Sequence, residues 1–392
     1  MKRALINTAL VLASLVVGLL VSEIALRLIG FDYPPFWRPD PVTGLALRPN
    51  TSGWFRKEGE AYVSINSNAL RDRERPVAKP PGTYRIVVLG DSYAEALQVD
   101  VARTFWRLLE KQLQACDFQP GKQIDVINLG TSGFGTAQEL RALQTRGLAY
   151  SPDLILLAFF AGNDIRNNSR ELETEKLKPF YFLDDTGSLH LDDSFASSAE
   201  FQRRNSRLRN LGKEASKYLR TLQLVYYAKD VLESRVTGEG PAGAQGAIEP
   251  GLDDQVFATP QNAQWRNAWR VTERLITEIK RTASSAGSEF LLSTLSVGIQ
   301  VHPDRATRDA FAKKLGVPDL FYPERRLLEL GRTQDIRVIA LAPELLRRAE
   351  AGHIFLHGFS NTRMGSGHWN EAGHAAAADL LAEKLCRDKG GR

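Results

Sequence analysis

The sequence lacks the signatures of several classes of protein. No basic segment is interleaved with aromatic residues, and a net charge of +5 is mild for 392 residues, so we expect no nucleic-acid partner. The glycine-rich stretch 130–135 has neither G-x-G-x-x-G spacing nor the lysine of a P-loop, which argues against a phosphate-binding loop. His353 and His357 have the spacing of metal ligands on a helix, but glycines flank them, so we expect neither a metal nor a cofactor.

Cysteine is scarce. The sequence has two, Cys116 at the end of a predicted helix 104–116 and Cys386 in the predicted last helix. In a five-stranded doubly wound sheet these two helices can share one face, which would allow a disulfide and would fit an oxidising compartment. The alternative is two unrelated buried thiols.

Charge is absent from the beginning of the chain. Between Arg3 and Glu23 no residue is charged, and residues 4–21 are almost wholly apolar. As a helix rising about 1.5 Å per residue, this stretch approaches the roughly 30 Å hydrocarbon thickness of a bilayer. No A-x-A-like cleavage site follows, so we favour an uncleaved membrane anchor over residues 1–31, with a cleaved signal peptide as the alternative. Lys2 and Arg3 precede the span and predict a cytoplasmic N-terminus with the body of the protein outside.

Residues 32–80 are rich in proline and aromatic residues and contain strand-like runs such as 61–65, so we expect a stalk or a packed extension. Strands and helices then alternate over residues 81–392, which predicts an α/β fold with a flavodoxin-like, doubly wound sheet of five parallel strands. The predicted strands are 85–89, 125–129, 154–160, 289–295 and 336–341, and the predicted helices are 104–116, 137–150, 264–286 and 373–385.

An insertion at about 167–261 interrupts this alternation. Residues 177–191 predict a β-hairpin with its turn at 184–187. Apolar residues from 208 to 232 recur at helical spacing with a basic remainder. We favour a surface helix packed on the domain over a lid or a membrane-surface helix. Residues 238–251, dense in glycine, alanine and proline, predict a flexible loop.

Three of the predicted strands end in residues suited to acyl transfer, which requires a nucleophile, a base and donors to the developing oxyanion. The first strand ends at Gly90-Asp91-Ser92, so Ser92 should lie in the turn at its carboxyl end, where open α/β sheets bind ligands. The second strand runs from Asn128 into a glycine-rich loop, where Gly133 can offer a backbone N–H. The third delivers Asn163, whose amide can complete the oxyanion hole.

Each of these motifs alone has an ordinary explanation. Gly-Asp-Ser and Gly162-Asn163-Asp164 are common turns, because aspartate, asparagine and serine favour turns and helix caps. His368, far downstream, can cap the helix that follows it. Because three of the signals fall at strand ends of one predicted sheet, their conjunction favours a serine-hydrolase site.

The same residues, in this order, resemble the SGNH (GDSL-type) hydrolase superfamily over roughly residues 85–385. Ile65-Asn66-Ser67 with Leu70-Arg71-Asp72 resembles the membrane-anchored bacterial branch of that superfamily. The site residues that this resemblance implies are the nucleophile Ser92, the general base His368, the oxyanion donors Ser92, Gly133 and Asn163, and the supporting residues Asp91, Asn128 and Asp164.

One departure from the superfamily pattern concerns the residue that orients the histidine. An aspartate usually lies two or three residues before it, and Ser366 and Gly365 occupy those positions here. Losing an orienting carboxylate can lower the rate by several orders of magnitude. Ser366, a backbone carbonyl or an acid from the insertion are the candidate acceptors, and a Ser-His dyad is the alternative.

We therefore expect an extracytoplasmic serine esterase that removes O-acyl groups, acetyl foremost, from carbohydrate through an acyl-Ser92 intermediate. The resemblance implies a single-pass protein of a bacterial inner membrane, with its catalytic domain in the periplasm or outside the cell. One alternative is an O-acyltransferase that modifies a cell-envelope or secreted polysaccharide. Another is a non-catalytic envelope protein that binds carbohydrate, which the missing aspartate would favour.

Overall fold

The protein, seen in a computed structural model that describes residues 1–237 and 252–387, is built around a sheet of five parallel strands. The strand order is β11-β10-β7-β5-β6, which is 2-1-3-4-5 when the five strands are numbered along the chain. The predicted flavodoxin-like sheet is therefore confirmed. The strands are β5 (Thr83–Gly90), β6 (Gln123–Asn128), β7 (Leu154–Phe159), β10 (Glu289–Thr294) and β11 (Arg337–Ala340).

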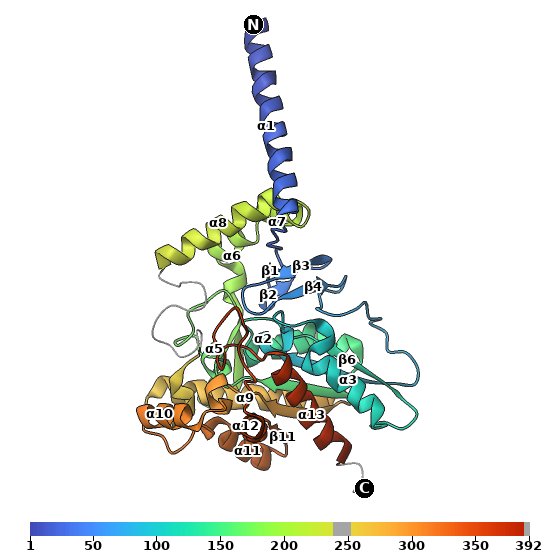
Figure 1. Ribbon diagram of the computed structural model, residues 1–392. Coiled ribbons are helices and arrows are strands. Elements are labelled where there is room, and N and C mark those ends of the chain that lie inside the picture. The colour runs from blue at the N-terminus through green and yellow to red at the C-terminus, as the bar shows by residue number, and fades with distance from the viewer. Residues whose placement is uncertain (238–251, 388–392) are drawn as a thin grey trace.

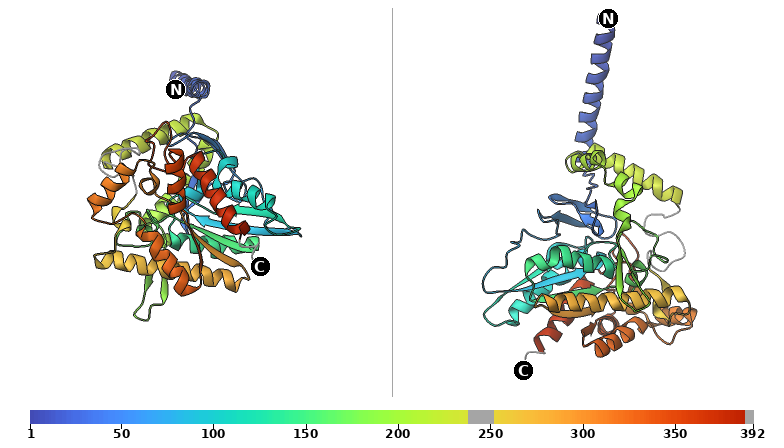
Figure 2. Two further views of the ribbon diagram at one scale, coloured as in Figure 1. Left: turned by 60° about the horizontal axis from the view of Figure 1, so that its bottom comes forward. Right: turned by 180° about the vertical axis from the view of Figure 1, so that it is seen from behind.

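Helices cover this sheet (Figures 1 and 2), so every residue of β5 and β7 is buried, which explains their almost continuous apolar runs. The predicted helix 137–150 is α-helical only to Ala142 and continues as a π-helical and then a 3-10 turn. Three further helices, α10 to α12, were not predicted from the sequence. The helices of this domain outside the insertion that are longer than four residues are α3 (Phe105–Ala115), α4 (Thr136–Ala142), α9 (Ala263–Ser285), α10 (Arg305–Leu315), α11 (Tyr322–Gln334), α12 (Ala342–Gly352) and α13 (Glu371–Arg387).

The N-terminal helix α1 (Lys2–Leu28) projects away from the body of the protein (Figure 1) and is long and apolar enough to cross a membrane. Residues 32–80 then pack on the domain through a small apolar cluster that includes Phe36, Val63 and Leu97. They form two antiparallel pairs, β1 (Trp37–Asp40) with β2 (Gly44–Leu47), and β3 (Thr51–Phe55) with β4 (Ala61–Ile65). This segment is thus a packed extension, the second of the two forms expected from the sequence.

The insertion contains the predicted hairpin, β8 (Phe180–Leu183) with β9 (Leu189–Asp192), followed by α6 (Ala199–Arg204). The single helix expected from the apolar pattern at 208–232 is wrong, because the segment bends and forms two helices, α7 (Arg207–Ser216) and α8 (Arg220–Thr237). A new helix begins at Arg220 because the Glu23 carboxylate accepts the backbone N–H groups of Arg220 and Thr221, each at 3.0 Å. The loop predicted at 238–251 lies outside the described residues.

The two cysteines lie on neighbouring helices. Cys116 directly follows α3, Cys386 lies near the end of α13, and these helices pack side by side. A disulfide joins the two residues, whose Cα atoms are 6.4 Å apart. Because they are 270 positions apart, the bond closes most of the domain into one covalent loop.

Breaking this disulfide is expected to lower the free energy of unfolding by about 4 kcal/mol, because the open unfolded chain regains conformations that the loop forbids. Denaturant unfolding of a Cys116→Ser/Cys386→Ser variant against the oxidised wild type measures the change. A reducing agent should destabilise the wild type by a similar amount and leave the variant unaffected. Equal stability of the variant and the oxidised wild type would contradict this expectation.

Candidate active site

Ser92 lies where the first strand of the sheet ends. After Gly90 the chain turns at Asp91, and Ser92 begins the one-turn helix α2 (Ser92–Glu95). Asp91 caps this helix, since its Oδ1 accepts the backbone N–H of Tyr93 at 2.9 Å. The turn requires glycine at position 90, because a Cβ there would lie 2.8 Å from the Cβ of Ala94. The strand thus delivers the serine hydroxyl to the carboxyl edge of the sheet.

His368 faces Ser92 from the loop that precedes α13. Its Nε2 lies 2.8 Å from Ser92 Oγ, which is the hydrogen-bond distance a general base needs to take the hydroxyl proton. The ring of Tyr93 lies beside the imidazole, and its hydroxyl donates to the carbonyl of Gly367 at 3.0 Å. The loop that carries His368 is therefore held against the helix that begins at Ser92.

The acid that orients His368 is Glu58. Its Oε2 lies 2.5 Å from His368 Nδ1, and its Oε1 accepts the backbone N–H of His368 at 2.7 Å. Burial alone raises the pKa of Glu58, but the hydrogen bonds and charge of His368 outweigh it, so the pKa lies below its ordinary value. Glu58 is therefore a carboxylate at neutral pH, and Ser92, His368 and Glu58 form a hydrogen-bonded line.

Glu58 comes from the N-terminal extension, in the turn between β3 and β4. The side chain of Asn361 clamps this turn, because its Oδ1 accepts the N–H of Gly59 at 2.9 Å and its Nδ2 donates to the Gly59 carbonyl at 3.0 Å. Gly367 has a φ of +84°, and a Cβ there would collide with the Glu58 carboxylate. Glycine at 367 is thus what admits an acid from outside the histidine loop.

This finding corrects the candidate acceptors named from the sequence, since Glu58 belongs neither to the insertion nor to the residues before His368. The two residues are 310 positions apart, so no local spacing could reveal the pair. The usable signal was the missing aspartate itself, which required an acceptor elsewhere. The structure also explains why position 365 holds glycine and not aspartate, because Gly365 has a φ of +83° and a Cβ there would lie 2.6 Å from the ring of His302.

Restoring the superfamily's aspartate is expected not to help. Gly365→Asp forces a side chain onto left-handed backbone and against His302, so we expect a loss of about 1 to 3 kcal/mol in unfolding free energy and no gain in kcat. Ser366→Asp, one position on and without a positive φ, is the matched control for the added charge. Thermal unfolding and ester hydrolysis measure both effects. Recovery of activity when Gly365→Asp is added to a Glu58→Gln variant would contradict this geometry.

The expected oxyanion donors gather at the same edge of the sheet. Gly133 adopts a φ of +76° in the loop after β6, and Asn163 directly precedes the one-turn helix α5 (Asp164–Asn167) after β7. Asn163 Nδ2 lies 3.3 Å from Asp91 Oδ2, so Asp91 orients this amide beside the serine turn. Lys178 of the insertion donates from Nζ to the Gly133 carbonyl at 3.3 Å. Both donors are therefore held by neighbouring side chains.

Asn128 and Asp164 hold the backbone around these donors. The Nδ2 of Asn128 donates to the Ala94 carbonyl at 2.7 Å, and its Oδ1 accepts the N–H of Gly130 at 2.9 Å. This residue ties α2 to the glycine-rich loop. Asp164 Oδ2 accepts the N–H of Phe160 at 2.8 Å, which closes the turn at the end of β7.

A cavity of about 360 Å³ opens beside Gly133 and Asn163. It is lined by the N-terminal extension, by the loops after β6 and β7, and by the insertion. The extension and the insertion together supply most of its lining residues. Aromatic rings alternate there with polar and charged groups, the combination that typical small-molecule sites use. Its aromatic walls are Trp37, Phe134 and Phe201, and its cationic groups include Arg38, Arg166 and Lys178.

Glu95 connects one wall of this cavity to the oxyanion loop. Its Oε1 accepts the indole N–H of Trp37 at 2.9 Å, and its Oε2 accepts the hydroxyl of Ser132. The side chain is fully buried, and this burial raises its pKa to about 7. Sequence reasoning gave Glu95 no role, although it lies only three residues after Ser92.

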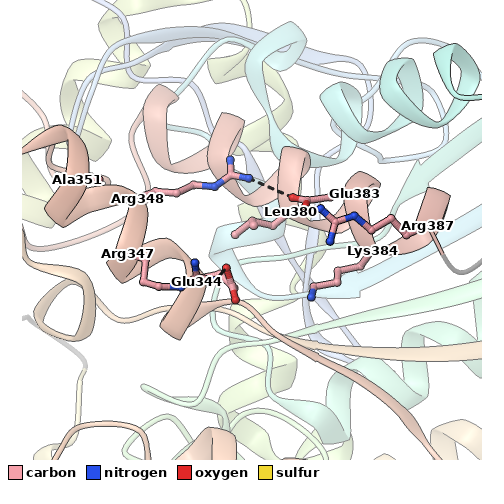
Figure 3. A pocket seen from close by; sticks show the side chains of 8 residues that line it. All are labelled: Glu344, Arg347, Arg348, Ala351, Leu380, Glu383, Lys384 and Arg387. Carbon is pink, nitrogen blue, oxygen red and sulfur yellow. Dashed lines mark hydrogen bonds and ion pairs between the residues drawn. The ribbon is translucent and has the colours of Figure 1, made fainter.

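A second cavity, of about 500 Å³, lies between α12 and α13 (Figure 3). Charged side chains line it and pair with one another, as Arg348 and Glu383 do at 3.6 Å. None of its lining residues belongs to the Ser92 site.

His357 supports the histidine loop. Its Nε2 lies 2.9 Å from Ser296 Oγ and its Nδ1 lies 2.7 Å from the Gly367 carbonyl, and burial lowers its pKa to about 4. It is therefore a neutral, hydrogen-bonded core residue. Within residues 1–237 and 252–387, no cluster of three or more His, Cys, Asp or Glu is arranged to hold a metal ion.

Comparison with known proteins finds similarity to solved structures only. No model of a protein family and no curated protein sequence matches the chain. Similar solved structures include an acetyl xylan esterase (12% identity, 76% of this chain and 98% of that one, TM-score 0.38). A catalytic mutant of an acetylxylan esterase from Geobacillus stearothermophilus has 10% identity over 78% of this chain and 95% of that one, with a TM-score of 0.39.

A third similar structure, described as a lipolytic protein of the G-D-S-L family from Desulfitobacterium hafniense, has 12% identity over 77% of this chain and 99% of that one, with a TM-score of 0.35. The sequence identities and TM-scores of these structures are too low to bear on the activity or substrate of this chain. The strand order of the central sheet gives this chain a flavodoxin-like α/β fold, and Ser92, Gly133 and Asn163 lie at the carboxyl edge of the sheet.

Proposed function

We propose that the protein is an SGNH-type serine esterase that removes O-acyl groups, acetyl foremost, from carbohydrate. The observation that carries the proposal is the hydrogen-bonded line of Ser92, His368 and Glu58, with His368 Nε2 2.8 Å from Ser92 Oγ. Nucleophile, base and orienting acid come from three separate parts of the chain. A purely structural role would not require their alignment next to two potential oxyanion donors and a cavity.

In the first half of the reaction, Ser92 Oγ attacks the ester carbonyl while His368 Nε2 takes its proton. Glu58 holds the imidazole in the tautomer that leaves Nε2 free and stabilises the imidazolium that forms. The backbone N–H groups of Ser92 and Gly133 and the amide of Asn163 donate to the oxyanion. The bond between the acyl carbon and the sugar oxygen then breaks. The leaving sugar alkoxide takes the proton from His368, and an acyl-Ser92 ester remains.

In the second half, water attacks the acyl ester with His368 again as base, and the acyl group leaves as a carboxylic acid. An O-acyltransferase would use a sugar hydroxyl in place of that water. The non-catalytic alternative loses its main support, because Glu58 supplies the carboxylate that the local sequence lacks.

The proposed location is a membrane surface, with α1 as a single-pass anchor and the catalytic domain on the extracytoplasmic side. Its support is the exposure of the whole apolar segment of α1, together with Lys2 and Arg3 before it. The disulfide is consistent with an oxidising compartment.

Acetate release from acetylated oligosaccharides tests this function. Full-length wild type should release acetate, and Ser92→Ala should release none above background while retaining its unfolding temperature. Adding an unacetylated oligosaccharide distinguishes hydrolysis from transfer, because a transferase would move the acetyl group to a hydroxyl of that oligosaccharide. Equal acetate release by wild type and Ser92→Ala would refute the proposal.

A further inference from the structure

Helices α7 and α8 form an L-shaped element, residues 207–232, that we call the elbow. Its apolar side chains are unusually exposed: Leu208 is 81% exposed, Leu211 67% and Val225 62%. On α8 the exposed residues Leu224, Ala228 and Leu232 recur every fourth position, so they share one stripe. Such a stripe should face the core of a soluble protein, and here it faces outward.

The elbow is fastened to the base of α1. Besides capping α8 through its backbone, Glu23 Oε2 accepts the Thr221 hydroxyl at 3.1 Å, and Arg27 donates from Nη2 to the Tyr218 carbonyl at 2.7 Å. Tyr33 donates its hydroxyl to Asp230 at 2.8 Å. Figure 1 shows α8 crossing the end of α1 that meets the body of the protein, and the view from behind in Figure 2 agrees. The elbow therefore lies directly beside the end of the apolar helix.

The charge of the elbow favours an anionic surface. Residues 207–232 contain six basic side chains and two acidic ones, and Tyr218 at the bend is 72% exposed. Lys217 is nearly buried and Arg220 partly so, and they pair with Glu214 and Asp32. The exposed basic residues are Arg207, Arg209 and Lys229. Exposed leucine and valine between lysine, arginine and tyrosine are typical of helices that lie in the plane of a membrane interface. The basic residues of this segment are Arg207, Arg209, Lys213, Lys217, Arg220 and Lys229.

We propose that the elbow lies in the headgroup region of the same bilayer that α1 crosses, with its apolar side chains inserted at the boundary with the acyl chains. The proposal rests on α1 being an uncleaved membrane anchor. It takes up the membrane-surface alternative that the sequence left open for this segment. A second copy of the chain or another protein on this surface is an alternative that the experiment below tests.

This placement has a consequence for the candidate active site. Phe201 and Arg204 of α6 line the cavity next to the oxyanion donors, and α6 leads directly into α7. Lys217 donates to the Pro49 carbonyl at 2.8 Å, which ties the elbow to the extension that builds another wall. These contacts would hold the cavity close to the membrane surface, so the substrate would have to bind there.

Site-specific fluorescence tests the proposal on the full-length protein. Leu211→Cys and, separately, Val225→Cys are labelled with NBD without reducing agent and reconstituted in phosphatidylethanolamine/phosphatidylglycerol vesicles. Leu328→Cys on α11 is the matched control, because Leu328 is also exposed, at 45%. Helix α11 lies at the opposite end of the molecule from α1 (Figure 1). Each vesicle is prepared with and without lipids that carry a nitroxide quencher near the headgroup end of the acyl chain.

We expect blue-shifted emission and at least a twofold loss of fluorescence with the nitroxide lipid at positions 211 and 225, and no change at 328. Emission at positions 211 and 225 that is as insensitive to the quencher as emission at 328 would overturn the proposal. The same result is expected if another protein, and not lipid, covers the elbow. Release of the protein from the vesicles by carbonate would overturn the proposal as well, because it would show that α1 is not a membrane anchor. Labelling of Ser92 by a phosphonate probe on the same vesicles reports the esterase site independently, so failure of one proposal is distinguishable from failure of the other.

Discussion

Replacing Glu58 by glutamine is expected to lower kcat by about 10³- to 10⁴-fold while changing KM little. Glutamine nearly preserves the shape of the side chain but removes the charge that stabilises the imidazolium, and its amide can hold His368 in the wrong tautomer. Because the pKa of Glu58 lies below its ordinary value, the wild-type group is ionised at neutral pH, so the substitution removes a full charge. Initial rates with a small acetyl ester, from pH 6 to 8, measure the loss.

Glu60→Gln is the matched control for Glu58→Gln. Glu60 lies two positions further along the same turn, its side chain is largely exposed, and it pairs only weakly with Arg56 at 3.4 Å. Its substitution should leave kcat within about twofold of wild type. Comparable rates for Glu58→Gln and Glu60→Gln would remove Glu58 from the catalytic line and restore the Ser-His dyad that the sequence left open.

His368→Ala is expected to lower kcat/KM by about 10⁴- to 10⁶-fold, because the substitution removes the base hydrogen-bonded to Ser92 Oγ and a serine hydroxyl is barely nucleophilic at neutral pH. Burst kinetics with an activated ester should show no acyl-enzyme phase. His190→Ala, in the exposed hairpin of the insertion, is the control and should behave as wild type. Turnover of acetyl esters by His368→Ala at the wild-type rate would contradict the interpretation of this site as a serine-hydrolase site.

The central sheet could be predicted from the sequence because its inner strands β5 and β7 are buried on both faces. The apolar runs of the strands end at glycine or polar residues, so residues such as Gly90 and Asn128 mark both the strand end and the edge where ligands bind. The positions of Ser92, Asn163 and Gly133 followed from those ends. Local sequence carries this information, since each motif lies within a few residues of its strand.

Glu58 could not be predicted in the same way. Its position depends on how an extension with short strands folds back over the sheet, and on Asn361 and Gly367, which are some 300 residues away. The bend between α7 and α8 was missed for a similar reason, because the Glu23 carboxylate that caps α8 belongs to a distant helix. Long-range contacts of this kind leave no periodicity in the sequence.

The N-terminal extension therefore has two roles in the site. It supplies the orienting acid, and through Trp37, whose indole N–H donates to Glu95, it also builds a wall of the cavity. Removing residues 32–80 should abolish catalysis as well as detach the domain from α1. A truncated domain is thus a poor substitute for the full chain in any assay of activity.

The central claim is that Ser92 is a nucleophile activated by His368 and Glu58, and covalent labelling with a fluorophosphonate probe tests it most directly. Peptide mapping by mass spectrometry should find the label on Ser92 of the wild type and no label on Ser92→Ala. Glu58→Gln should label at least a hundredfold more slowly than Glu60→Gln. Equal labelling of wild type and Ser92→Ala, or a label mapped to another serine, would contradict the claim.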